Sequence, residues 1–160
     1  MSVSAEDFRA ALSQWATGVT VVTARAGDAI HGMTVSDFCG VSLRPPLVLV
    51  CADKTSHTHE LIARGGAFAA NVLAADQAAL SNRFASKEDE WRRFEGLACA
   101  SAATGAPLIP GALVSFDCRL EAAHDAGDHV IYVGRVEAIV RGEGRPLVYW
   151  RGGYRALVAE

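Results

Sequence analysis

The amino-acid sequence has no long hydrophobic run and no excess of positive charge. None of its apolar stretches approaches the roughly 20 residues that a membrane-spanning helix needs, so we expect no membrane segment. The first residues also lack a basic stretch followed by an apolar one, the pattern of a secretory signal peptide, and the expected location is therefore the cytoplasm. The formal net charge of −3 argues against a nucleic acid or an anionic membrane surface as a partner recognised by bulk charge.

Common catalytic and metal-binding motifs are also absent. The four cysteines contain no C-x-x-C pair, so we expect reduced residues in or near the core and no disulfide framework. His57 and His59 have no cysteine or carboxylate at ligand spacing, which favours surface histidines and no metal site. The sequence has no G-x-S-x-G, no P-loop and no G-x-G-x-x-G, which argues against a serine hydrolase triad and a standard phosphate-binding fingerprint.

What is present is the composition of an ordinary globular protein. The 160 residues, of which 51% are apolar and 21% charged, favour one domain over residues 1–160 with a sizeable core. Short β-prone segments separated by turn residues outnumber the two or three helical patterns. This order does not indicate alternating βαβ units. It predicts a mainly β, α+β fold in which an antiparallel sheet closes into a barrel with added helices.

The N-terminal region predicts a helix followed by a strand. Ser4 is a candidate N-cap. Apolar residues then recur at helical spacing, namely Phe8, Leu12 and Trp15. Gly18 suits the left-handed conformation that ends many helices, so we expect the helix to end near it. The β-branched run 19–24 predicts a strand, and the Gly-Asp turn that follows it predicts a hairpin.

The stretch 30–52 reads as two apolar strands around a shelf of small and hydroxylated residues. The unbroken apolar run 47–50 predicts a strand buried on both faces. On the shelf, Thr34 and Ser36 offer hydroxyl groups to the polar edge of a ligand. Later in the chain, the charged segment 86–95 is expected to be exposed.

Residues 53–58 follow the second of these strands directly and are polar. Main-chain N–H groups, hydroxyl groups and the charge of Lys54 could bind a phosphate there, but the residues alone favour a solvated turn. Arg83 on a predicted helix could supply a second positive charge or lie free on the surface. The residues alone leave both alternatives open.

The order of several short motifs resembles a known family. In chain order the motifs are T-G-V-T-V-V-T over 17–23, G-M-T-V-S-D-F over 32–38, V-S-L-R-P-P-L-V over 41–48, N-V-L over 71–73, G-D-H over 127–129 and P-L-V-Y over 146–149. Over about residues 8–157 the chain resembles the short flavin reductases, the small components of two-component flavin-dependent monooxygenases. The order and spacing of the motifs make the resemblance specific, because each motif alone is weak.

The resemblance implies a split β-barrel of antiparallel, Greek-key type that forms a homodimer and binds FMN or FAD near the subunit interface. It implies hydride transfer from NADH to the flavin, followed by release of reduced flavin to a separate monooxygenase. NADPH is less favoured, because no arginine pair can be assigned to a 2′-phosphate. The alternatives are a split-barrel protein that stores or carries flavin or binds haem, and an oxidase that acts on its own small substrate.

The resemblance also implies a set of site residues. His129 is the expected catalytic residue, on the nicotinamide side. The expected flavin-binding residues lie in four segments: Met33, Thr34, Val35, Ser36 and Asp37 along the isoalloxazine; Cys51, Ala52, Asp53, Lys54, Ser56, His57 and Thr58 around the ribityl chain and phosphate; Ser81, Asn82, Arg83 and Phe84 on the far phosphate or adenylate side; and Tyr154 as an aromatic lid.

Asp37 departs from the family pattern, in which Ser or Asn is common at this position. A carboxylate that faced the ring would disfavour the anionic reduced flavin and lower its potential, whereas one that faced solvent or an arginine would have no such effect. His57 also stands where small hydroxylated residues are common, which leaves the phosphate contacts less defined.

Overall fold

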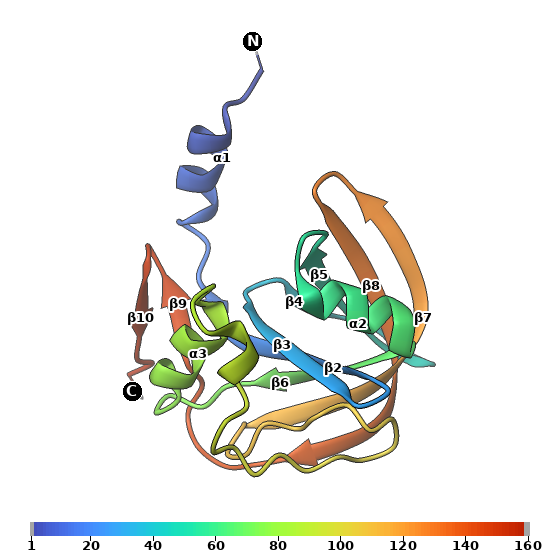
Figure 1. The fold of residues 1–160 in the computed structure, drawn as a ribbon. Coiled ribbons are helices and arrows are strands. Elements are labelled where there is room, and N and C mark those ends of the chain that lie inside the picture. Colours follow the sequence, from blue (N-terminus) through green and yellow to red (C-terminus); the bar gives the residue numbers. More distant parts are fainter. Residues whose placement is uncertain (1, 159–160) are drawn as a thin grey trace.

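The computed structural model describes residues 2–158. Its helices are α1 (Ala5–Leu12), α2 (His57–Gly65), α3 (Ala78–Ala85) and the short 3₁₀ helix η1 (Glu90–Arg92). Its strands are β1 (Thr17–Gly18), β2 (Thr20–Ala26), β3 (Ala29–Val35), β4 (Phe38–Leu43), β5 (Pro46–Asp53), β6 (Ala67–Val72), β7 (Val114–Ala126), β8 (His129–Arg141), β9 (Val148–Trp150) and β10 (Gly153–Arg155). Figure 1 shows these elements.

Seven strands form one curled antiparallel sheet in the order β3-β2-β6-β7-β8-β5-β4. The two edge strands, β3 and β4, follow each other in the chain but do not pair with each other. Ser36 and Asp37 alone connect them, so these two residues cross the seam where the barrel is split. The mainly β, split-barrel prediction is confirmed.

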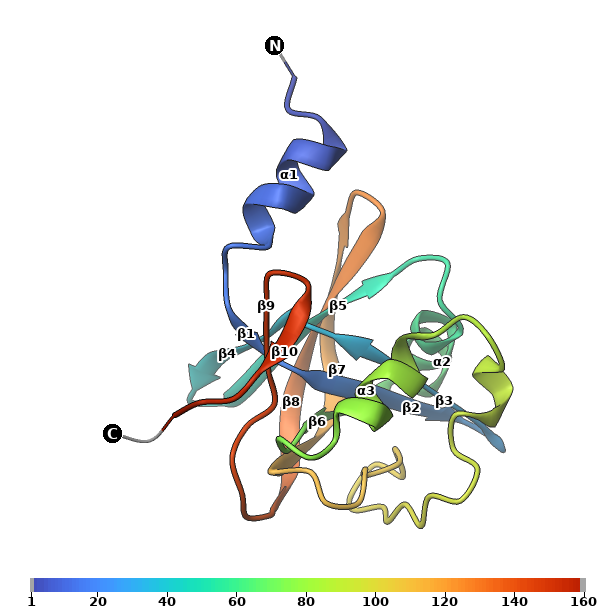
Figure 2. The same ribbon diagram turned by 90° about the vertical axis from the view of Figure 1, so that its left-hand side faces the viewer.

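The core lies inside this curled sheet. Val22, Val50 and Phe68 are fully buried, and α2 closes one side of the core by packing on β2 and β3. A glycine is required at position 134, because a Cβ there would lie 2.5 Å from the Phe68 ring. On the outer side, α3 and the loop after it cover β3, as Figure 2 shows.

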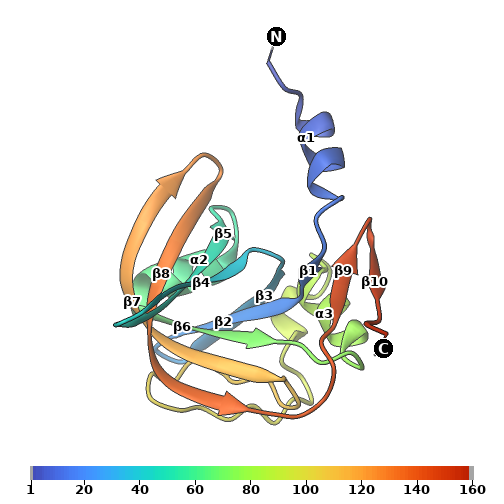
Figure 3. The same ribbon diagram turned by 180° about the vertical axis from the view of Figure 1, so that it is seen from behind.

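A second, three-stranded sheet joins the two ends of the chain. Its order is β1-β9-β10, and Thr17 pairs with Tyr149. Figure 3 shows this sheet beside α3, with α1 extending away from the rest of the molecule. None of the residues of α1 is buried. Among the described residues, no helix is long and apolar enough to cross a membrane.

Local capping explains where several elements begin and end. The predicted hairpin is confirmed: β2 pairs with β3 through a turn in which Gly27 has a φ of 61°. The hydroxyl of Ser56 caps α2 by accepting a hydrogen bond from the His59 N–H at 3.1 Å. Gly66 ends the same helix with a φ of 64°, a conformation that favours glycine.

Two expectations for local structure were wrong. The first helix ends at Leu12 instead of near Gly18, because β1 takes Gly18 into the small sheet. β5 is buried on one face only, since its residues alternate between buried and half-buried. The charged segment 86–95 is exposed or half-exposed as expected, except for Arg93, which is 5% exposed because its guanidinium group binds main-chain oxygen atoms.

Candidate functional site

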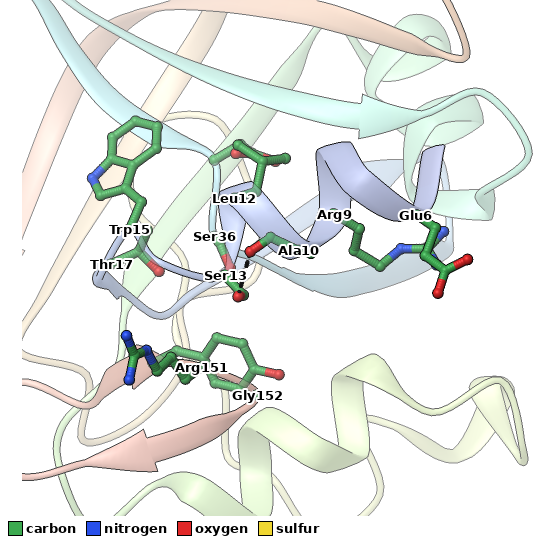
Figure 4. Close-up of a pocket in the computed structure, with 12 residues that line it drawn as sticks. Glu6, Arg9, Ala10, Leu12, Ser13, Trp15, Thr17, Ser36, Arg151 and Gly152 are labelled. Carbon is green, nitrogen blue, oxygen red and sulfur yellow. Dashed lines mark hydrogen bonds between the residues drawn. The ribbon is translucent and has the colours of Figure 1, made fainter. Parts of the chain in front are cut away.

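The seam of the barrel opens into a cleft of about 600 Å³. Ser36 and Asp37, which cross the seam, form part of its wall. Figure 4 shows Leu12 and Trp15 on one side of the cleft and Arg151 on another. The volume lies within the range of small-ligand pockets. Because its wall combines aromatic surface with a few charged groups, the cleft suits a flat, partly polar ligand.

A hydrogen-bonded cluster joins β3, α3 and β10 beside the seam. The Thr34 hydroxyl donates to the main-chain oxygen of Ser81 at 2.7 Å. The Tyr154 hydroxyl lies 2.8 Å from the Ser81 hydroxyl and 2.7 Å from the side-chain oxygen of Asn82. Three segments that are distant in the sequence therefore meet here, and all four residues are in the predicted site.

The shelf is also tied to β5. The main-chain N–H of Cys51 donates to the Asp37 oxygen at 3.3 Å. Further along β5, Asp53 lies opposite His129 on β8. Strand pairing therefore places the phosphate-side segment next to the Gly-Asp-His turn, and a main-chain hydrogen bond ties the shelf to β5.

The 53–58 segment is held in shape by its own polar groups. The Asp53 carboxylate accepts hydrogen bonds from the Thr55 hydroxyl and N–H, both at 2.7 Å. These bonds, with smaller contributions from the charges of His129 and Lys87, lower the pKa of the Asp53 carboxyl. The Ser56 hydroxyl donates to the Asp53 main-chain oxygen at 2.8 Å. Asp53 therefore shapes the loop and keeps its negative charge at neutral pH.

Lys54 connects this segment to the Gly-Asp-His turn. Its ammonium group donates to the Gly127 main-chain oxygen at 2.6 Å and forms a salt bridge with Asp125, while its N–H donates to the Asp128 oxygen at 3.0 Å. An ammonium group has three donors. Two are used here, so one is available to a phosphate oxygen atom.

His129 is positioned by its neighbour. Its Nδ1 lies 2.7 Å from the Asp128 carboxylate, and the side chain is 39% exposed. The charge of His129 and this hydrogen bond lower the pKa of the Asp128 carboxyl, the hydrogen bond contributing more. The Asp of the motif thus holds the imidazole ring through Nδ1.

Other predicted residues are in less accessible positions. Ala52, Thr58 and Phe84 are fully buried, and Met33 is 9% exposed. The three fully buried residues therefore expose neither side-chain nor main-chain atoms in this structure. Arg83 is also engaged, because its Nη2 donates to the main-chain oxygen atoms of Arg92 at 2.7 Å and Glu95 at 2.5 Å.

The sequence analysis missed several residues of the cleft. Trp15, Tyr149 and Arg151 line it, and the Arg151 side chain is held by Gln14 at 2.6 Å. The P-L-V-Y motif contains Tyr149 and could have indicated it. Arg151 has a φ of 48°, a local turn geometry that no sequence pattern indicated.

The described residues contain no group of three or more His, Cys, Asp or Glu residues arranged to hold a metal ion. The cysteines at positions 39, 51, 99 and 118 are free.

Comparison with known proteins identifies the family. The model of the flavin reductase like domain matches residues 12–158, which include all the site residues predicted from the sequence. The chain belongs to this family. It is 44% identical over 151 residues to the protein "FMN reductase (NADH) SmoA" of Agrobacterium fabrum, with 94% of this chain and 85% of that protein covered.

Two further flavin reductases show how far the likeness extends. The HsaB reductase subunit of a flavin-dependent monooxygenase from Rhodococcus jostii is 40% identical over 152 residues, covering 94% of this chain and 76% of that protein. The structure of the NADH:FAD oxidoreductase SgcE6 of Streptomyces globisporus has a TM-score of 0.89 at 32% identity, covering 99% and 98% of the two chains. Both relatives match this flavin reductase over nearly its whole length.

Proposed function

We propose that this flavin reductase transfers a hydride from NADH to FAD or FMN and supplies the reduced flavin to a separate flavin-dependent monooxygenase. The observation that carries the proposal is the family match over residues 12–158, since it includes all the segments that meet at the seam. Relatives with both flavins support it: SmoA is named an FMN reductase, and SgcE6 a NADH:FAD oxidoreductase.

The residues at the seam fit a flavin. The cleft of about 600 Å³ is large enough for a flat ring system. We propose that Met33 to Asp37, with Cys51, lie along the isoalloxazine, and that Lys54, Ser56 and His57 hold the phosphate end. The free donor of Lys54 and the N-terminal end of α2 both suit an anion.

The catalytic requirements on the protein are modest. When bound, the nicotinamide and flavin themselves supply the electron pair and the acceptor for hydride transfer. The protein holds the two rings at the right distance and orientation. We assign His129 to the nicotinamide side, where Asp128 fixes the ring orientation. Tyr154 ties β10 to α3 through its hydrogen bonds to Ser81 and Asn82.

NADH oxidation with added FAD or FMN tests this function. We expect turnover that requires flavin, and a loss of at least tenfold in kcat/KM in His129→Ala with the fold intact. Flavin that stays bound without NADH turnover would instead support the storage or carrier alternative. No flavin-dependent oxidation of NADH or NADPH by the intact protein would reject the reductase function.

We also propose that the protein is a homodimer with one domain per chain. None of the residues of α1 is buried, and its Phe8 is 58% exposed; Trp15, which follows the helix, is 70% exposed. On β4, Leu43 is 92% exposed. Exposed apolar surface on this scale is typical of an interface, and a second copy of the chain would cover it.

Sedimentation of the wild-type protein and of Phe8→Asp tests the dimer. We expect a dimer for the wild type and a shift toward monomer for the variant, because a buried carboxylate has no partner there. Arg64→Asp, an exposed substitution at the end of α2, is the control and keeps the wild-type mass. A wild-type monomer at assay concentration would contradict the proposal.

The proposed location remains the cytoplasm.

A further inference from the structure

One exposed aromatic side chain has no role in the function described above. Trp91, in η1, is 73% exposed. Its ring centroid lies 4.6 Å from that of His57, with 42° between the planes. His57 is the first residue of α2 and follows Ser56 in the phosphate-side segment. An aromatic pair therefore stands at the edge of the proposed flavin site.

Contacts of buried residues anchor the loop that carries Trp91. The buried Arg93 donates to the Gly32 main-chain oxygen at 2.8 Å and to that of Ser86. The Glu90 carboxylate lies 3.4 Å from Nε2 of the buried His31. The Arg93 hydrogen bond to Gly32 and the contact between Glu90 and His31 tie the loop to β3. The indole is thus held outward in a defined position while its neighbours point inward.

The same loop carries an exposed cation. Lys87 precedes η1 by three residues and lies four residues before Trp91. Its charge also contributes to the lowered pKa of the Asp53 carboxyl, for which hydrogen bonds from Thr55 are the main cause. The loop therefore presents one exposed cation and one exposed indole close together in the chain.

We propose that Trp91, His57 and Lys87 form a subsite for the adenosine diphosphate part of a dinucleotide, with the adenine on the Trp91–His57 pair and a phosphate group beside Lys87. A purine stacks on any exposed aromatic face, and an ammonium group pairs with phosphate oxygen atoms. FAD and NADH both carry this group and FMN lacks it. The proposal rests on the reductase function for the choice of these two nucleotides.

The position of the subsite suits a dinucleotide whose other half lies at the seam. The 53–58 segment, proposed to hold the phosphate end of the flavin, adjoins His57 in the chain. A second phosphate and an adenosine that continue from this point meet Lys87 and Trp91 next. FMN, which ends at its single phosphate, reaches neither side chain.

Binding of ADP to the wild-type protein and to Trp91→Ala, measured by calorimetry, tests the subsite directly. We expect Trp91→Ala to weaken ADP binding about tenfold, as removal of one base-stacking side chain does. Trp91→Phe keeps an aromatic face and should stay within about threefold of the wild type. The Kd of FMN should not change in either variant.

The same variants distinguish the two sources of the adenylate. If the group belongs to FAD, Trp91→Ala raises the Kd of FAD about tenfold and leaves the KM of NADH, measured with FMN, unchanged. If it belongs to NADH, the KM rises and the Kd of FAD does not. Unchanged binding of ADP, FAD and NADH would overturn the proposal, as would an equal loss of FMN binding or a change in oligomeric state.

A second variant tests the cation. Lys87→Gln should weaken ADP binding and reduce its salt dependence, whereas Arg64→Gln, an exposed cation at the far end of α2, should do neither. Equal effects of the two variants would overturn the assignment of Lys87. Failure of the reductase function gives a different result, because ADP would still bind through Trp91 while NADH oxidation was absent.

Discussion

Acidification should destabilise this protein through the buried imidazole of His31. Burial, reinforced by the positive charge of Arg93, lowers the pKa of His31 from 6.5 to about 4, although Glu90 acts in the opposite direction. The side chain is 2% exposed, and its Nδ1 is hydrogen-bonded to the Thr58 hydroxyl at 2.8 Å. Between pH 6.5 and 4 the unfolded chain therefore binds a proton at this position that the folded chain does not.

The magnitude follows from proton linkage. While the unfolded chain binds one more proton than the folded chain, the free energy of unfolding decreases by about 1.4 kcal/mol for each unit by which the pH is lowered. Over the interval from 6.5 to about 4 the loss at His31 is about 3 kcal/mol. Below pH 4 both states carry the proton, so His31 contributes no further loss. This is a large part of the stability of a typical domain, about 5–15 kcal/mol.

Urea unfolding at several pH values, at one protein concentration, measures this loss. The wild type should lose about 3 kcal/mol more than His31→Gln between pH 6.5 and 4. Carboxyl groups with lowered pKa, such as those of Asp53 and Asp128, also destabilise the fold as pH falls, but they are common to both proteins and cancel. His124→Gln, at an exposed position of β7, is the control. Equal losses in the wild type and His31→Gln would refute the reasoning.

Three further substitutions have defined outcomes. Asn71→Ala should lower the free energy of unfolding by about 2–3 kcal/mol in urea titrations. The fully buried side-chain amide donates a hydrogen bond to Val21 and accepts hydrogen bonds from Ile109 and Ser115, and the substitution removes all three. Gly134→Ala should lower the melting temperature, with a cost of about 1–3 kcal/mol, since its Cβ would overlap the Phe68 ring; an unchanged value would show that the ring moves freely. Tyr154→Phe should raise the Kd of flavin about threefold to tenfold by releasing β10 from Asn82, and fluorescence titration measures this.

The barrel could be predicted because its strands carry strong local signals. The β-branched residues of β2 and the turn at Gly27 specify a hairpin without help from distant residues. The end of α1 could not be predicted, because Gly18 pairs with Val148 near the other end of the chain. Local propensity gives no information about such a partner.

The candidate site was predictable only as far as its motifs were. Gly-Asp-His and the 53–58 segment were recognised separately, and the structure places Asp53 opposite His129. The inward direction of Arg93 was not predictable, since its partner is a main-chain oxygen of Gly32 on an edge strand. Main-chain groups are present at every position, so no residue type indicates this contact. The catalytic and flavin-binding roles of the site residues stay predictions.

The pairing of β1 with β9 has a consequence during synthesis. Thr17 leaves the ribosome early, but its partner Tyr149 is among the last residues made. At about 5–20 residues per second, the interval is on the order of ten seconds. Throughout that time Leu12 of α1 lacks Tyr149, the residue of the small sheet with which it lines the cleft. A chaperone that binds exposed apolar helices would find this nascent chain accessible for most of its translation.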